Sequence, residues 1–93
     1  MVVAAQTWRL SLPGCSSLKE KRSVVRSLKD RLRHRFNVSV SETGEQDVHQ
    51  RAEITIALVA TDRRFAEEVL DKADRLVQEL GRAVILDLLR DFY

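Results

Sequence analysis

A chain of 93 residues has the length of one domain and can bury an ordinary hydrophobic core without disulfides. Its one cysteine and two histidines cannot supply the four ligands of a structural zinc site. The sequence offers neither a signal-peptide core nor the ~18 consecutive apolar residues that span a bilayer. We therefore expect one cytoplasmic domain over residues 1–93, with no metal, no cofactor and no membrane contact.

The net charge of +2 conceals an uneven distribution along the chain. Residues 1–41 contain nine Lys or Arg against two acidic residues, and residues 42–93 contain seven against twelve. The first part therefore carries +7 and the second −5, which favours an anionic partner on one side or docking between oppositely charged surfaces. Twelve arginines, four lysines and a single asparagine are also consistent with a thermophilic source.

The first two predicted elements are a strand and a helix. Apolar and polar residues alternate over 2–12, which predicts a half-buried strand that Pro13 and Gly14 end. Ser16 or Ser17 can cap a helix that begins near Leu18 and runs to Arg33 or His34. With Ser17 as the cap, Glu20 stands at the third helical position and completes a capping box.

The remaining elements follow from changes of periodicity and from turn residues. We expect a strand over 36–41, a polar loop over 42–47, a strictly alternating strand over 50–60, a helix that follows Thr61 or Asp62 and ends at Gly81, and a strand over 83–90. The order βαββαβ is typical of the ferredoxin-like α+β fold, in which two helices cover one face of an antiparallel four-stranded sheet.

Alternation within the strands divides their side chains between a core face and an open face. The expected core contains Trp8, Leu10, Val25, Leu28, Leu32, Ile54, Ile56, Leu58, Val69, Leu76 and Leu86. The expected open face is moderately apolar, has no aromatic residue, and carries Val3, Ala5, Thr7, Arg9, Thr55, Ala57, Val59, Ile85, Asp87 and Leu89.

Five cations recur along the first helix at spacings of three and four residues. At 100° per residue they lie within an arc of roughly 80°, beside the apolar face of the helix. Like charges at these spacings repel, so an arc without acidic residues indicates an anionic ligand. The alternative is a solvated surface that balances the charge of the acidic half. We call these residues the basic stripe: Lys19, Arg22, Arg26, Lys29 and Arg33.

Several segments resemble the YlxP family of small bacterial proteins, a domain of unknown function. The most specific are Ser17-Leu18-Lys19-Glu20-Lys21-Arg22 and Phe36-Asn37-Val38-Ser39-Val40. The resemblance implies a ferredoxin-like fold and genes that often lie among those for translation initiation and ribosome maturation. Relatives often carry a large aromatic residue where this chain has His49.

These features predict a non-catalytic accessory protein that binds RNA or the ribosome through the basic stripe. Base stacking on the sheet, as in RNA-recognition motifs, is not expected, because the strand over 50–60 has no aromatic residue and Trp8 belongs to the core face. The contacts should then go mostly to phosphate, with little sequence specificity. The alternative is a protein-interaction module that forms a homodimer through the open sheet face and has no role with nucleic acid.

Two further groups of residues invite a functional interpretation. The turn before the first helix resembles the phosphate loop of acylphosphatases in position, but no arginine lies between Arg9 and Arg22, so we expect no catalytic residue and no small-molecule substrate. No general base lies near Cys15 in the sequence, so we expect an unreactive thiol in a loop. Four residues join the acidic loop to the strictly alternating strand over 50–60 and could anchor the loop or contact a partner: Asp47, His49, Gln50 and Arg51.

Overall fold

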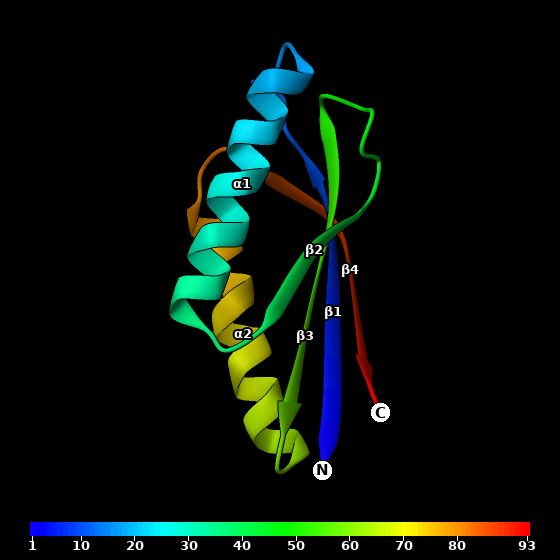
Figure 1. Ribbon diagram of the computed structural model, residues 1–93, viewed down its shortest axis with the longest axis vertical. Coiled ribbons are helices and arrows are strands. Elements are labelled where there is room, and N and C mark those ends of the chain that lie inside the picture. Colours follow the sequence, from blue (N-terminus) through cyan, green and yellow to red (C-terminus); the bar gives the residue numbers. More distant parts are fainter.

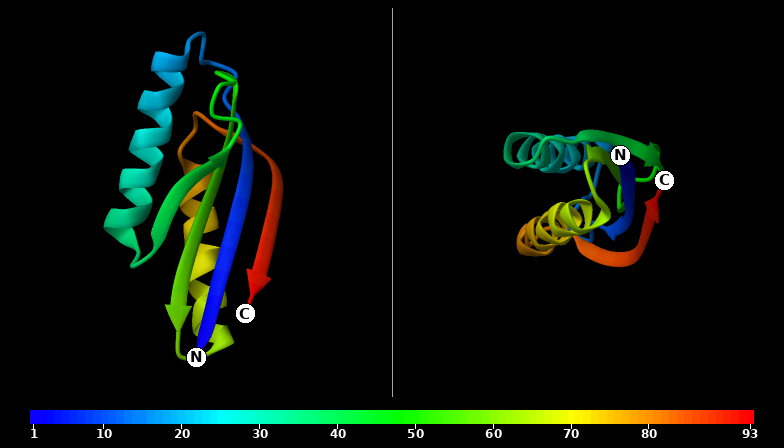
Figure 2. Two further views of the ribbon diagram at one scale, coloured as in Figure 1. Left: turned by 45° about the vertical axis from the view of Figure 1, so that its right-hand side comes forward. Right: turned by 90° about the horizontal axis from the view of Figure 1, so that it is seen from below.

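In the computed structural model, which describes residues 1–93, two helices cover one face of a four-stranded antiparallel sheet (Figure 1). Seen along its length, the sheet curves around the side on which both helices lie (Figure 2). The strand order is β2-β3-β1-β4. The elements are β1 (Val2–Ser11), α1 (Leu18–Arg35), β2 (Ser39–Gly44), β3 (Arg51–Ala60), α2 (Arg63–Glu79) and β4 (Val84–Phe92). The predicted ferredoxin-like fold is confirmed.

None of the helices combines the length and the apolar character needed to cross a membrane.

Serine and aspartate caps fix where both helices begin. Ser17 is the N-cap of α1, and its Oγ accepts a hydrogen bond of 3.2 Å from the backbone N–H of Glu20. The Glu20 carboxylate turns back to Ser16, accepting from its Oγ at 2.8 Å and from its N–H at 3.3 Å. The capping box therefore closes on Ser16, the residue before the cap. Asp62 caps α2 by accepting from the N–H of Phe65 at 2.8 Å.

The core lies between the sheet and the helices, as the alternation predicted. Trp8 is completely buried, and its Nε1 donates to Oδ1 of Asp74 on α2 at 2.9 Å. Val69, expected in the core, is only partly buried and packs against its margin. The other expected side chains that the structure buries are Leu10, Val25, Leu28, Leu32, Ile54, Ile56, Leu58 and Leu76.

A β-bulge in β4 overturns two assignments made from alternation. Arg9 lies opposite Asp87 and Leu10 lies opposite Ile85, so Leu86 is an extra residue without a partner on β1. Ile85 consequently faces the helices and packs against the core, although it was expected on the open face. Leu86, expected in the core, is 49% exposed. One inserted residue reverses the faces on its N-terminal side, because side chains alternate with a period of two.

The edge strand β2 begins and ends later than predicted. Residues 36–38 connect α1 to the sheet, and the N–H of Phe36 still donates to the carbonyl of Leu32 at 2.9 Å. Glu42, Thr43 and Gly44, expected in a loop, extend the strand. This extension brings Glu42 beside α1, where it contacts Lys21.

Candidate nucleic-acid interface

The basic stripe lies where α1 runs beside the outer edge of the sheet. Figure 2 shows α1 next to β2, while α2 lies on the side of β4. A surface groove of about 320 Å³ separates α1 from β2. We call it the basic groove; its lining residues are Arg22, Val25, Arg26, Lys29, Asp30, Arg33 and Glu42. Four of the five stripe cations therefore converge on one concave surface, and Lys19 extends the row one turn toward the start of α1.

Arg33 is held in place by the edge strand. Its Nη2 donates to the backbone carbonyl of Val40 on β2 at 3.1 Å, and its Nη1 lies 3.7 Å from Oδ1 of Asp30. The first contact satisfies a carbonyl of an edge strand, which would otherwise be open to pairing with another chain. Arg33 thus has a structural role in addition to its charge, and Asp30 offsets part of that charge.

A buried ion pair lies beneath the groove. The Nζ of Lys21 lies 2.8 Å from Oε2 of Glu42 and also donates to the backbone carbonyl of Glu45. Lys21 is 1% exposed, so its charge acts in a poorly hydrated environment. The positive charge of Lys21 offsets the carboxylate of Glu42, which would otherwise repel an anion in the groove.

Sequence reasoning missed Lys21, although a signal was present. Lys21 precedes Val24, Val25 and Leu28 by three, four and seven residues, which places it on the apolar face of α1. A lysine at such a position needs a buried partner, and the partner came from a segment expected to be a solvated loop.

The remaining stripe residues have no compensating charge. Lys19, Arg22, Arg26 and Lys29 take part in no ion pair and no side-chain hydrogen bond. By contrast, Arg63 and Arg64 on α2 pair with glutamates one turn along that helix. Unpaired cations on a rigid helix can bind anionic groups without first breaking internal contacts.

The loop between β2 and β3 is held by residues other than those expected. The side chains of Asp47, His49, Gln50 and Arg51 are exposed and form no hydrogen bond or ion pair within the chain, and the segment is anchored there through the backbone carbonyl of Gln50, which accepts from the N–H of Leu12 at 2.9 Å. The loop is held instead by Lys21, by Arg9, which lies 3.6 Å from Glu45, and by Gln46, which donates to the carbonyl of Glu42 at 3.1 Å. Contact of the four exposed residues with a partner stays a prediction.

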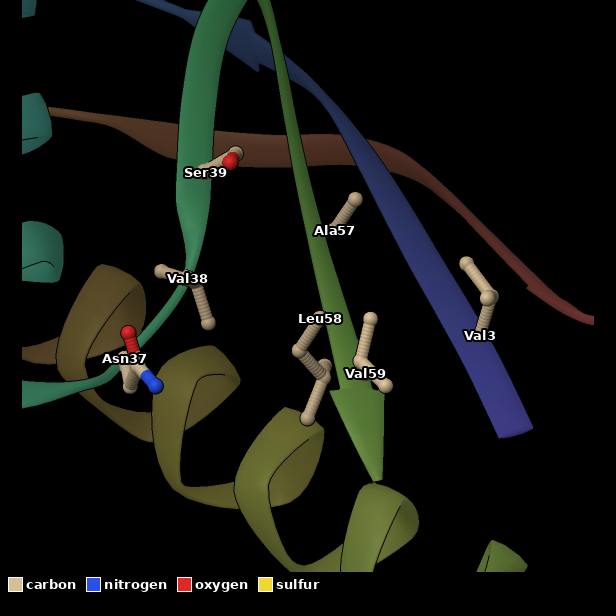
Figure 3. Close-up of a pocket in the computed structure, with 7 residues that line it drawn as sticks. All are labelled: Val3, Asn37, Val38, Ser39, Ala57, Leu58 and Val59. Carbon is tan, nitrogen blue, oxygen red and sulfur yellow. The ribbon is translucent and has the colours of Figure 1, made fainter. Parts of the chain in front are cut away.

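A second hollow of about 320 Å³ lies at the other end of the sheet. Figure 3 shows side chains from β1, from β3, from the start of β2 and from the two residues before it: Val3, Ala57, Leu58, Val59, Ser39, Asn37 and Val38. None of them is ionisable, so this hollow has no charge with which to attract a phosphate. The thiol of Cys15 is buried in the core and faces neither hollow.

Comparison with known proteins identifies a family. The family described as "Protein of unknown function (DUF503)" matches residues 3–90. Over 56 residues the chain is 45% identical to "Uncharacterized protein YlxP" of Bacillus subtilis (strain 168), a match that spans 60% of this chain and 61% of that protein. The aligned region is thus less than two thirds of the relative's length.

Two solved structures share the fold. The de novo designed protein Foldit4 has a TM-score of 0.58 at 10% identity and covers 100% of this chain and 97% of its own. SnoaB, a cofactor-independent oxygenase from Streptomyces nogalater, has a TM-score of 0.55 at 12% identity and covers 99% and 90%. At these identities the likeness concerns the fold alone.

Proposed function

The chain belongs to the DUF503 family of proteins of unknown function, and we propose that it is a non-catalytic cytoplasmic protein that binds RNA, free or within the ribosome, through the basic stripe. The observation that carries the proposal is the basic groove. Arg22, Arg26 and Lys29 line it without any internal ion pair, while Lys21 and Arg33 offset its two carboxylates.

The dimensions of the stripe suit a phosphate backbone. From Lys19 to Arg33 the helix rises ~21 Å at 1.5 Å per residue, with one cation about every 5 Å. Regularly spaced cations on a rigid helix can contact several phosphates of one polynucleotide at once. On the open face, β1 and β3 have no aromatic side chain on which bases could stack. The aromatic residue on this side is Tyr93, which follows β4, pairs with Val3 through two backbone hydrogen bonds and is 76% exposed, although the open face was expected to have none. RNA binding should therefore depend mainly on backbone charge and shape.

Salt dependence tests the proposal directly. Fluorescence anisotropy with a labelled structured RNA, repeated over a series of salt concentrations, should give a log–log slope on the order of −3 to −5 for four or five phosphate contacts. Arg22→Ala and Arg26→Ala should each reduce the slope by a little under one unit, and by similar amounts on RNAs of different sequence.

Matched controls are available on α2. Lys72 and Arg75 are exposed and take part in no ion pair, so Lys72→Ala and Arg75→Ala remove the same charge from the other helix. These variants should leave the slope nearly unchanged. Equal losses from both helices would show diffuse attraction only, and absence of binding at about 50 mM salt, where phosphate contacts are strong, would refute the proposal.

A further inference from the structure

The sheet face opposite the helices is covered by no part of the chain. On the central strands β1 and β3 it presents Val3, Ala5, Thr7 and Arg9 beside Val59, Ala57, Thr55 and Glu53. Its large apolar side chains are well exposed, with Val59 at 69% and Leu89 of β4 at 61%. On its central strands the face is therefore apolar at one end and charged at the other, and an exposed apolar patch of this kind is typical of an interface.

The register between the central strands gives this face a regular pattern. Four of the open-face residues of β1 lie opposite a similar or complementary residue of β3, from Val3 with Val59 to Arg9 with Glu53, and at the end of the strands Ser11 lies opposite Arg51. Between the valine pair and the charged pair, Ala5 lies opposite Ala57, and the hydroxyls of Thr7 and Thr55 are hydrogen-bonded at 2.9 Å. Each of these cross-strand pairs forms one row of the face. Exchanging β1 with β3 would leave the valine, alanine and threonine rows unchanged, and in the fourth row it would exchange the arginine for the glutamate.

We propose that a second copy of the chain packs on this face, related by a two-fold axis that runs parallel to β1 and β3 and midway between them. The rotation places β1 over the partner's β3, because the axis passes through the centre of the strand order β2-β3-β1-β4. Val3 then lies over the partner's Val59, and Arg9 lies over the partner's Glu53. The central strands are thus self-complementary in shape and charge, while Asp87 and Asp91 of β4, which share this face, lie over the polar β2 of the partner.

Other positions of the axis are less favourable. An axis along β1 itself would stack Arg9 on the partner's Arg9. An axis across the strands would bury the charged row against the valine row, which leaves charges without partners in an apolar environment. With the axis between the central strands, the partner's β4 lies over β2 and the adjoining hollow of Figure 3.

The size of the face is sufficient for a dimer of moderate affinity. Four strands of six to ten residues, at ~3.3 Å per residue and ~4.8 Å between strands, present roughly 550 Å² per copy. Two copies would bury roughly 1,100 Å², near the lower limit for specific interfaces, so dissociation should occur in the micromolar range. The basic stripes would lie on the outer helical layers, free to bind RNA.

Charge reversal at one row tests the arrangement. Arg9→Glu places two glutamates over two glutamates, and Glu53→Arg places two arginines over two arginines, so each variant should dissociate at least tenfold more readily than the parent chain in sedimentation equilibrium at about 1 to 100 µM. An equimolar mixture of the two variants should restore the dimer as a heterodimer, since every charge then faces its opposite. The exposed Arg64→Glu, which lies on α2, is the control and should dimerise normally.

Mixing the two charge-reversal variants shows whether a loss of dimer comes from contacts between copies or from contacts within one copy. Arg9 also approaches Glu45 of its own chain at 3.6 Å, but mixing cannot repair an internal contact. Val59→Asp, at a position already exposed in the single chain, provides a second variant that should fold normally and lose the dimer. A parent chain that stays monomeric at about 100 µM, or variants that fail to associate when mixed, would overturn the proposal without affecting the test of RNA binding.

Discussion

The ammonium group of Lys21 lies 2.8 Å from the carboxylate of Glu42 and joins the first turn of α1 to the edge strand β2. Both charges are largely removed from water, so their attraction is stronger than that of a surface pair, and each depends on the other. The pair therefore fixes the separation between α1 and β2, and with it the width of the basic groove.

Breaking this pair should destabilise the protein strongly. Glu42→Gln leaves the ammonium of Lys21 buried without a counter-ion and should lower the free energy of unfolding by about 3–5 kcal/mol. The double variant Lys21→Met with Glu42→Gln should recover most of that loss, because no buried charge remains. Urea denaturation of both variants measures the difference. A loss below about 1 kcal/mol in Glu42→Gln would show that the pair is hydrated in solution.

Removing the exposed carboxylate from the basic groove should increase RNA affinity. Asp30→Asn abolishes a negative charge that lines the groove and pairs with Arg33 at 3.7 Å. We expect about a twofold tighter Kd for structured RNA at low salt and a change in the free energy of unfolding within about 0.5 kcal/mol, because this ion pair is exposed. Fluorescence anisotropy measures the RNA affinity, and urea denaturation measures the free energy of unfolding. Weaker RNA binding would mean that Asp30 positions Arg33 for the contact.

Because of the bulge in β4, truncation of two adjacent residues should change the stability by different amounts. Ile85→Ala should lower the free energy of unfolding by about 1–2 kcal/mol, since Ile85 packs against the core, whereas Leu86→Ala should change it by less than about 0.5 kcal/mol. Thermal or urea denaturation of both variants distinguishes the register with the bulge at Leu86 from the regular alternation without it. The reverse order of effects would place the bulge elsewhere.

The contribution of the α1 cap should depend on pH. The hydrogen bond from Ser16 Oγ, supported by the Ser16 N–H and by the charge of Arg82, holds the pKa of Glu20 below its ordinary value. A carboxyl group whose pKa is lower in the folded state stabilises that state above its ordinary pKa of about 4.3, and this contribution is lost as pH falls through the folded pKa. Glu20→Gln should therefore be less stable than the parent at pH 7 and equal to it near pH 2. A difference that persists in acid would point to a cause other than ionisation.

Local sequence determined which elements form and, outside the first residues of β4, which face each of them presents. Alternation in residues 2–12 and 50–60, the helical period of α1 and α2, and the caps at Ser17 and Asp62 depend on contacts within a few residues. The basic stripe was predictable for the same reason, since helical geometry alone places Arg22, Arg26 and Lys29 on one arc.

Only the tertiary structure decided which residues meet across elements. The bulge at Leu86 depends on the register between β4 and β1, which no local pattern encodes. Likewise, the contacts of Lys21 with Glu42 and of Arg33 with the Val40 carbonyl form because α1 packs against β2. The sequence by itself therefore determined that a row of cations exists, and packing determined that the row borders a groove in which Glu42 is already paired with Lys21.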